Sequence, residues 1–363
     1  ATSSRVIQEG MLWRWIGPIA LSLAGCGAAP TASETTTVGS GGITTGSGGE
    51  DGAASIGTSA GEGGELLDVA AADGGATTGG DGGERTGCES VDFLFVIDNS
   101  GSMGDNQQNL VDSFPGFIQA IQSTVAEASD YHIMVAKTDS GWGGDCPLLC
   151  QAFFGICPDI PEYPCMTGAP SMCDTVMGAG VTYPIGSDSS GELCSLAGQD
   201  RYITPADPDL GASFGCIAKV GTDGSGDERP VEALTGALSD TLNGAGGCNA
   251  GFLRDEAILV VTIITDEEDS SSAGSPQGWV TNVIAQKGGD GTGIVMIGLI
   301  NDPDATDSVC GADGEDPARL REFIESFPDS YRGSVCAPSY ADVLADAVGI
   351  IDTACDEYVP PAG

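Results

Sequence analysis

Carboxylate and hydroxyl side chains follow the apolar run that begins at residue 92. That run ends at Asp98, and Ser100 and Ser102 come next at alternate positions. A second apolar run, residues 257–265, also ends in an aspartate, Asp266. Such oxygen ligands, with no nitrogen or sulfur ligand beside them, are typical of sites for hard divalent cations such as Mg²⁺, Mn²⁺ and Ca²⁺. The chemistry indicated is therefore cation binding.

The segments around these residues alternate between strand-type and helix-type patterns. The sequence predicts strands at 92–98, 131–139, 257–266 and 293–302, and helices at 105–128, 229–242, 276–287, 316–327 and 339–355. This order predicts an α/β fold, with a doubly wound, mostly parallel sheet flanked by helices. Pro115 predicts a kink or a late start in the first helix, and Asp316 is expected to cap the fourth. Ligands of open α/β sheets bind beyond the carboxyl ends of the strands, where Asp98 and Asp266 are expected.

The segment DNSGS at 98–102 matches a known motif, the D-x-S-x-S motif of the von Willebrand factor A domain. The segment IITDEEDSS at 263–271 is similar to the strand whose final aspartate completes that family's metal-ion-dependent adhesion site. The chain therefore resembles this family over roughly residues 88–356. The sequence around these two motifs is similar to that of bacterial lipoproteins of the family from myxobacteria and their relatives. The resemblance implies the family's Rossmann-like sheet, in agreement with the alternation of elements.

The resemblance also implies a ligand set for one divalent cation, Mg²⁺ or alternatively Ca²⁺ or Mn²⁺. Asp98, Ser100 and Ser102 match the first motif, in which the serine hydroxyls bind the metal directly. Asp266 matches the later aspartate, which is often an indirect ligand. The family's remaining ligand is usually a threonine in a glycine-rich loop before a helix, which corresponds here to the loop GTDGSGDE at 221–228.

Two residues of this loop are candidates for the remaining ligand. Thr222 follows a glycine but lies far from the helix, whereas Glu228 lies six residues before Leu234, close to the family's usual offset. We favour Glu228 and keep Thr222 as the alternative. A glutamate would bind the metal more tightly and leave it less electrophilic toward a partner's carboxylate. Ca²⁺ would then be as suitable as Mg²⁺.

The function implied by the resemblance is binding. In the family, a partner's acidic side chain completes the metal shell, so we expect a metal-dependent adhesion or protein-interaction domain. We expect no enzyme, because the sequence contains no phosphate-binding loop. Its single histidine, His132, lies on a predicted strand and is a poor candidate for a catalytic base. The alternative is a structural envelope lipoprotein whose metal site only stabilises the fold.

The chain is strongly acidic. It has 53 acidic and 12 basic residues, which gives a formal net charge of −41. Binding to nucleic acid or to an anionic membrane surface depends on lysine and arginine, so neither is expected here. A divalent cation and a protein partner are the interactions that this composition favours.

The first residues have the pattern of a lipoprotein signal peptide, assigned to 1–26 with the true start possible at Met11. Leu-Ala-Gly before Cys26 resembles the bacterial lipobox, in which this cysteine is lipidated after cleavage. The following Gly27 departs from the inner-membrane retention signal, so we expect an outer-membrane lipoprotein that faces the periplasm or the cell surface. Residues 27–87 are rich in glycine, serine and threonine and are predicted to be a disordered tether.

The cysteines indicate disulfides. The chain has 13, and the twelve that follow Cys26 include no C-x-x-C pair. A zinc site is therefore disfavoured, and we expect up to six disulfides formed in an oxidising compartment. Seven of these cysteines lie in a Pro- and Gly-rich stretch at about 140–216, which we predict to be a disulfide-rich insertion. The domain is expected to span 88–356 and to be followed by a tail at 357–363.

Overall fold

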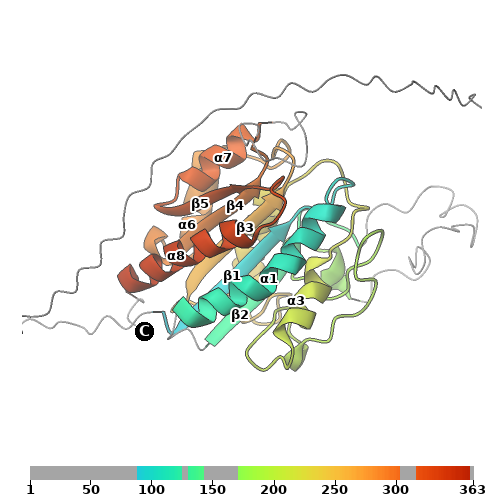
Figure 1. The fold of residues 1–363 in the computed structure, drawn as a ribbon, viewed down its shortest axis with the longest axis horizontal. Helices are drawn as coiled ribbons and strands as arrows, with labels where there is room; N and C mark the ends of the chain where they lie inside the picture. The colour runs from blue at the N-terminus through green and yellow to red at the C-terminus, as the bar shows by residue number, and fades with distance from the viewer. Residues whose placement is uncertain (1–87, 125–129, 143–170, 303–315, 360–363) are drawn as a thin grey trace, which may run out of the picture. The chain divides into compact units, whose positions relative to one another are not determined.

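The computed structural model describes residues 88–124, 130–142, 171–302 and 316–359 (Figure 1). The predicted signal peptide with Cys26 and the predicted tether at 27–87 lie outside the described residues. The same holds for part of the predicted insertion and for the last four residues of the predicted tail.

One parallel sheet forms the centre of the fold. Its five strands lie in the order β2-β1-β3-β4-β5, and every neighbouring pair is parallel. The strands are β1 (Ser90–Ile97), β2 (Asp130–Lys137), β3 (Ile258–Thr265), β4 (Ile294–Ile300) and β5 (Asp329–Ser334). All residues of β3 and β4 are buried, which explains their unbroken apolar runs. The predicted α/β class is confirmed.

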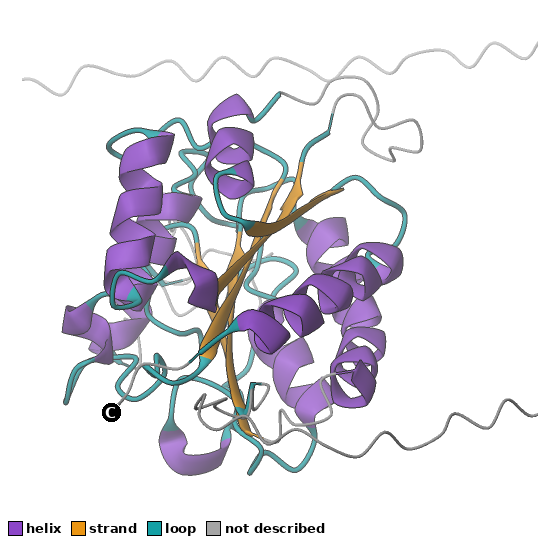
Figure 2. Ribbon diagram, turned by 90° about the vertical axis from the view of Figure 1, so that its left-hand side faces the viewer, coloured by secondary structure: helices purple, strands orange, loops and turns teal. Residues whose placement is uncertain are grey.

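Helices cover both faces of the sheet (Figure 2). One face packs against α1 (Gly104–Thr124), α3 (Leu210–Ala218) and α8 (Ala341–Glu357). The other packs against α4 (Pro230–Leu238), α6 (Pro276–Gln286) and α7 (Ala318–Glu325). Short helical segments are α5 (Asp240–Asn243), η1 (Met172–Thr175), η2 (Ala197–Gln199) and η3 (Gly291–Gly293). Successive residues of β1 enter opposite cores, Phe93 and Phe95 toward α1 and Leu94 and Val96 toward α4.

The strand order changes direction between β1 and β3. From β1 the chain moves outward to β2 and then returns to the other side of β1 to form β3, from which the sheet continues to β5. At such a switch point the two connections leave toward opposite faces, and a crevice opens between them. Asp98 follows β1 and Asp266 follows β3, and the backbone N–H of Asp98 donates to Ile264 O at 2.9 Å. The fold therefore places both aspartates at this crevice.

Two helix predictions need correction. Helix α1 begins at Gly104 and continues through Pro115, so the late start, one of the two predicted alternatives, is wrong. Asp316 does not cap α7, because its carboxylate instead accepts from Arg321 Nη2 at 2.7 Å. The first amides of α7 are capped by Glu268, from the loop after β3, whose Oε2 accepts from the backbone N–H of Arg319 at 2.7 Å. A cap distant in sequence has replaced the local one.

Besides the short η segments, one strand and one helix have no counterpart in the sequence prediction. Strand β5 is an edge strand with the sequence DSYRGS, and none of its residues is fully buried, so it lacks an apolar pattern. Helix α3 lies at the end of the predicted insertion, where we expected mainly loop. Its Phe214 is fully buried and stacks on Phe114 of α1, with ring centroids 3.4 Å apart. This part of the insertion therefore belongs to the core.

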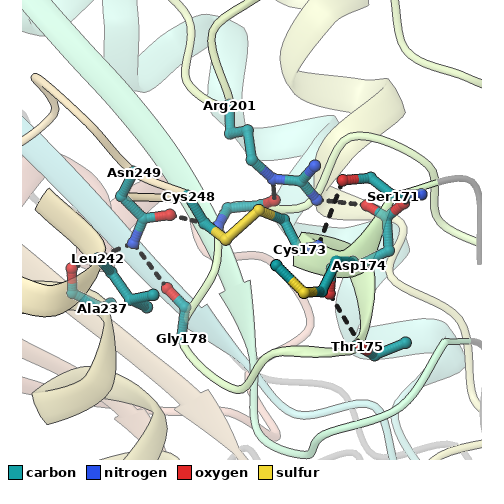
Figure 3. Close-up of a disulfide and its surroundings, with 12 residues drawn as sticks. Ser171, Cys173, Asp174, Thr175, Gly178, Arg201, Ala237, Leu242, Cys248 and Asn249 are labelled. Carbon is teal, nitrogen blue, oxygen red and sulfur yellow. Dashed lines mark hydrogen bonds and ion pairs between the residues drawn. A yellow bond between two sulfur atoms is a disulfide. The ribbon is translucent and has the colours of Figure 1, made fainter. Parts of the chain in front are cut away.

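Disulfides attach the insertion to the sheet domain and to itself. Cys173–Cys248 links η1 to the segment after α5 (Figure 3). Cys194–Cys216 lies within the insertion. Beside the first, the buried Asn249 donates to Gly178 O at 2.9 Å and to Ala237 O at 3.1 Å. A third disulfide joins Cys88 to Cys355. The prediction of disulfide bonds is confirmed for these pairs.

Candidate metal centre

The first motif forms a tight turn whose carboxylate is held from two sides. Asp98 is fully buried, and its Oδ1 accepts from the backbone N–H of Ser100 at 2.7 Å. Its Oδ2 accepts from Thr265 Oγ1, at the end of β3, at 2.6 Å. The first contact is a turn that aspartate favours, because its short side chain reaches the amide two residues on. Both carboxylate oxygens are therefore fixed before any ligand binds.

The second aspartate joins this motif through the serine hydroxyls. Ser102 Oγ donates to Asp266 Oδ1 at 3.0 Å, and Ser100 Oγ lies 3.3 Å from Ser102 Oγ. The four residues predicted from the sequence at the ends of β1 and β3 thus form one continuous polar cluster. They are Asp98, Ser100, Ser102 and Asp266. Ser102 is exposed and Asp266 is partly exposed, so the cluster opens to solvent.

Glu228 extends the cluster inward. Glu228 is 1 % exposed, and its Oε2 accepts a hydrogen bond from Thr138 Oγ1. Its Oε1 has no hydrogen-bond partner among the described residues. Burial, and next the charge of Asp98, raise the pKa of Glu228 to about 9. Burial is also the main cause of the raised pKa of Asp98, to which the charge of Asp266 adds. A buried carboxyl oxygen without a partner, beside other carboxylates, is a suitable position for a cation.

The alternative ligand, Thr222, is engaged elsewhere. Its Oγ1 lies 3.0 Å from Asp188 Oδ2 and 3.3 Å from Ser187 O, both on the insertion. Its backbone N–H also donates to Ser187 O, at 2.9 Å. Of the two candidates, Glu228 has the unpartnered oxygen, and the charge of Asp98 acts on its carboxyl group. The geometry therefore favours Glu228 over Thr222 as the remaining ligand.

The sequence reasoning overlooked residues that hold the three loops together. Asp139 Oδ2 accepts from the backbone N–H of Ser225 at 3.0 Å, and its Oδ1 accepts from Asn99 Nδ2 at 3.3 Å. Thr138 contacts Glu228, as described above. Both residues follow β2 as Asp98 follows β1. The rule that ligands lie beyond strand ends therefore would have found them.

Gln107 of α1 is a second connecting residue. Its Nε2 donates to Asp98 O at 3.0 Å and to Gly221 O at 2.8 Å, and its Oε1 accepts from the backbone N–H of Gly221 at 3.2 Å. This fully buried amide joins the loop after β1 to the glycine-rich loop. No sequence signal separates Gln107 from the other polar residues of its helix.

The donor set fits a hard divalent cation. It consists of the carboxylates of Asp98, Asp266 and Glu228 and the hydroxyls of Ser100 and Ser102, all of them oxygen ligands. Within the described ranges no three His, Cys, Asp or Glu side chains are already gathered as a metal-binding group. The three predicted carboxylate ligands, Asp98, Asp266 and Glu228, are of those side-chain types, so a bound cation would have to draw them closer together than they lie here.

Comparisons with known proteins add little to this description. No protein-family model and no curated protein matches the sequence. Among solved structures, the chain is similar to proximal thread matrix protein 1 from the mussel byssus, with 15% sequence identity and a TM-score of 0.36. The match covers 74% of this chain and 49% of that chain, so it spans about half the length of the mussel protein. A likeness this weak carries no argument about function.

Proposed function

We propose that this protein is an envelope-anchored von Willebrand factor A domain lipoprotein that binds a divalent cation and, through it, a protein partner. The cation is Mg²⁺ or alternatively Ca²⁺ or Mn²⁺. The observation that carries the proposal is the unpartnered, buried Glu228 Oε1 beside the polar cluster of Asp98. A positive ion is the group that would satisfy this oxygen and offset the adjacent carboxylates.

Each residue of the cluster has a separate role in this proposal. Asp98 and Glu228 supply buried charge, Ser100 and Ser102 supply neutral oxygens, and Asp266 orients Ser102 through their 3.0 Å hydrogen bond. The bound cation supplies a positive charge and a coordination position for an oxygen of the partner. Since Ser102 lies exposed at the crevice, a partner can approach from this side.

Binding, and not catalysis, is proposed. The single histidine has a structural environment: His132 Nδ1 lies 2.9 Å from Phe252 O, and its ring packs against Tyr202 at 4.4 Å between centroids.

Anchoring through a lipid on Cys26 is part of the proposal. In the described part of the chain, no helix has the length and apolar character needed to cross a membrane.

The proposal is tested by removing one ligand. We expect calorimetric titration to show one Mg²⁺ or Ca²⁺ bound by the wild-type protein, and Asp98→Ala to lose this binding, because a buried ligand is deleted. Asp356→Ala, an exposed aspartate at the end of α8, is the control and should bind as the wild type does. Equal cation affinity in the wild type and in Asp98→Ala would rule out the proposed centre.

The second candidate function is a structural envelope protein in which the metal only stabilises the fold. The observation in its favour is again Glu228, because a third carboxylate lowers the electrophilicity of the cation toward a partner. Here EDTA should lower the melting temperature without altering the binding of any partner. In the adhesion proposal, EDTA and Asp98→Ala should both abolish partner binding.

The pH dependence of metal stabilisation follows from Glu228. In the metal-free fold its pKa is raised to about 9 from an ordinary 4.5, so the folded state holds a proton that the unfolded chain releases. The stability contributed by this proton is therefore lost as the pH rises from about 5 to 9. A cation favours the ionised carboxylate, so the increase in melting temperature caused by Ca²⁺ should be larger at about pH 8.5 than at about pH 6.

Thermal unfolding with and without saturating Ca²⁺ measures this difference. The variant Glu228→Gln has no titrating group at the position and should lose most of the pH dependence. A Ca²⁺ effect that is the same at both pH values in the wild type would show that Glu228 does not meet the cation.

A further inference from the structure

We infer that Glu228 makes the metal-loaded centre select a basic partner segment and reject an acidic one. The inference rests on the proposed function, since it concerns the partner of the same centre. It departs from the acidic partner that the family resemblance implies. The argument comes from the charges around the cation and from the residues that line the opening.

The first step is the charge of the loaded centre itself. Asp98, Asp266 and Glu228 bring three negative charges, and a divalent cation brings two positive ones, so the loaded centre keeps a net charge of about −1. Glu228 is the source of this excess, because a neutral ligand in its place would leave the centre balanced. Its burial, at 1 % exposure, separates the excess charge from solvent that would otherwise screen it.

The second step is that three basic side chains near the site loops, those of Lys137, Arg229 and Arg319, are engaged elsewhere. Lys137 Nζ lies 3.0 Å from Asp139 Oδ1, so this pair is close to neutral. Arg229 Nη1 lies 3.7 Å from Glu232 Oε2 on the first turn of α4. The guanidinium of Arg319 lies 4.5 Å above the ring of Trp279 and donates to the backbone of the loop after β3. Among the described residues, none of these three basic groups is paired with a carboxylate of the centre.

The third step is the rim of the opening, which is acidic as well. Asp105 lies in the first turn of α1, close after the first motif, Asp227 adjoins Glu228, and both are exposed. The exposed Asp188 belongs to the insertion and reaches the site loop through Thr222. Glu267 is partly exposed, and its charge contributes to the raised pKa of Glu228. An incoming carboxylate would meet negative charge both at the metal and around it.

The partner chemistry follows from these three steps. A neutral oxygen, such as a backbone carbonyl, would ligate the cation without adding charge. Lysine or arginine side chains beside that carbonyl can pair with the rim carboxylates. The ligand class is therefore a lysine- or arginine-containing protein segment. Glu228 is the specificity-determining residue, and the insertion contributes Asp188 to the same rim.

The test uses the full chain loaded with Ca²⁺ and two synthetic peptides of equal length, one rich in lysine and one rich in aspartate. Calorimetry should show Ca²⁺-dependent binding of the lysine peptide only. In Glu228→Gln at saturating Ca²⁺, the aspartate peptide should gain about tenfold or more in affinity and the lysine peptide should lose affinity. Glu357→Gln is the matched control, since it removes one exposed charge at the end of α8, outside the centre, and should change neither result.

The EDTA arm separates the centre from the overall charge of the chain. Chelation makes the centre more negative, so a lysine peptide held only by the net charge of −41 would bind more tightly in EDTA. The inference requires the opposite, a loss of binding. If the wild type binds no cation, the proposed function fails and the inference fails with it. If the wild type binds Ca²⁺ but prefers the aspartate peptide, only the inference is overturned.

Discussion

Substitution of Gly224 by alanine is expected to weaken cation binding by about tenfold or more, although Gly224 contacts no cation in the proposed centre. A Cβ at this position would lie 2.3 Å from Asn99 Nδ2 and 2.5 Å from Asn99 O. The backbone N–H of Gly224 also donates to Asn99 O at 2.8 Å. Because Asn99 O is a backbone atom, a side-chain rotation cannot relieve the clash. The glycine-rich loop must move away from the first motif.

The displacement matters because Glu228 lies on the same loop. It is four residues after Gly224, and the loop sets the position of its carboxyl group, on which the charge of Asp98 acts. Calorimetric titration with Mg²⁺ and Ca²⁺ measures the loss, and thermal unfolding in EDTA shows how much of it comes from a weaker fold. The substitution should lower the affinity by a larger factor than any change in the stability of the metal-free protein explains.

Gly226→Ala supplies the matched control. A Cβ at position 226 has no atom within 4 Å, and the residue is exposed on the same loop. This variant changes the flexibility of the loop by the same chemical step without creating a clash, so its cation affinity should equal that of the wild type. Wild-type affinity in Gly224→Ala would mean that the centre does not need the close approach of these two loops, and the assignment of Glu228 would then be incorrect.

The central sheet was predictable because its signals are local. The strands β1, β3 and β4 are buried on both faces and therefore read as unbroken apolar runs. The polar residues after β1 and β3 could be placed at one edge from the parallel topology alone. In the structure, hydrogen bonds join Asp98, Ser100, Ser102 and Asp266, as that reasoning required.

The features that were missed depend on contacts between distant segments. The edge strand β5 gains its pairing from β4 and carries no apolar pattern of its own. The cap of α7 comes from Glu268, some fifty residues earlier in the chain. The choice between Glu228 and Thr222 depends on whether the insertion engages Thr222, and only the fold shows the contact with Asp188. Residue types and spacing contain none of this information.

Removal of the Cys88–Cys355 disulfide is expected to destabilise the fold by about 5 kcal/mol, more than removal of any other disulfide described here. The bond spans a sequence separation of 267, so without it the unfolded chain gains the entropy of a very long open loop. It joins the residues before the central strand β1 to the last turns of α8. Both sulfurs belong to buried residues, 5 % and 3 % exposed. Urea unfolding of Cys88→Ala/Cys355→Ala measures the change in free energy of unfolding.

Cys194→Ala/Cys216→Ala gives the comparison, because this disulfide spans a separation of only 22. The same entropy relation predicts a loss of about 3 kcal/mol, so the two double variants should differ by about 2 kcal/mol. Equal losses would show that contacts in the folded state, and not the freedom of the unfolded chain, set the contribution of these bonds. Cation affinity separates the effects further. Neither disulfide touches the centre, so each variant should still bind the cation as the wild type does while it remains folded.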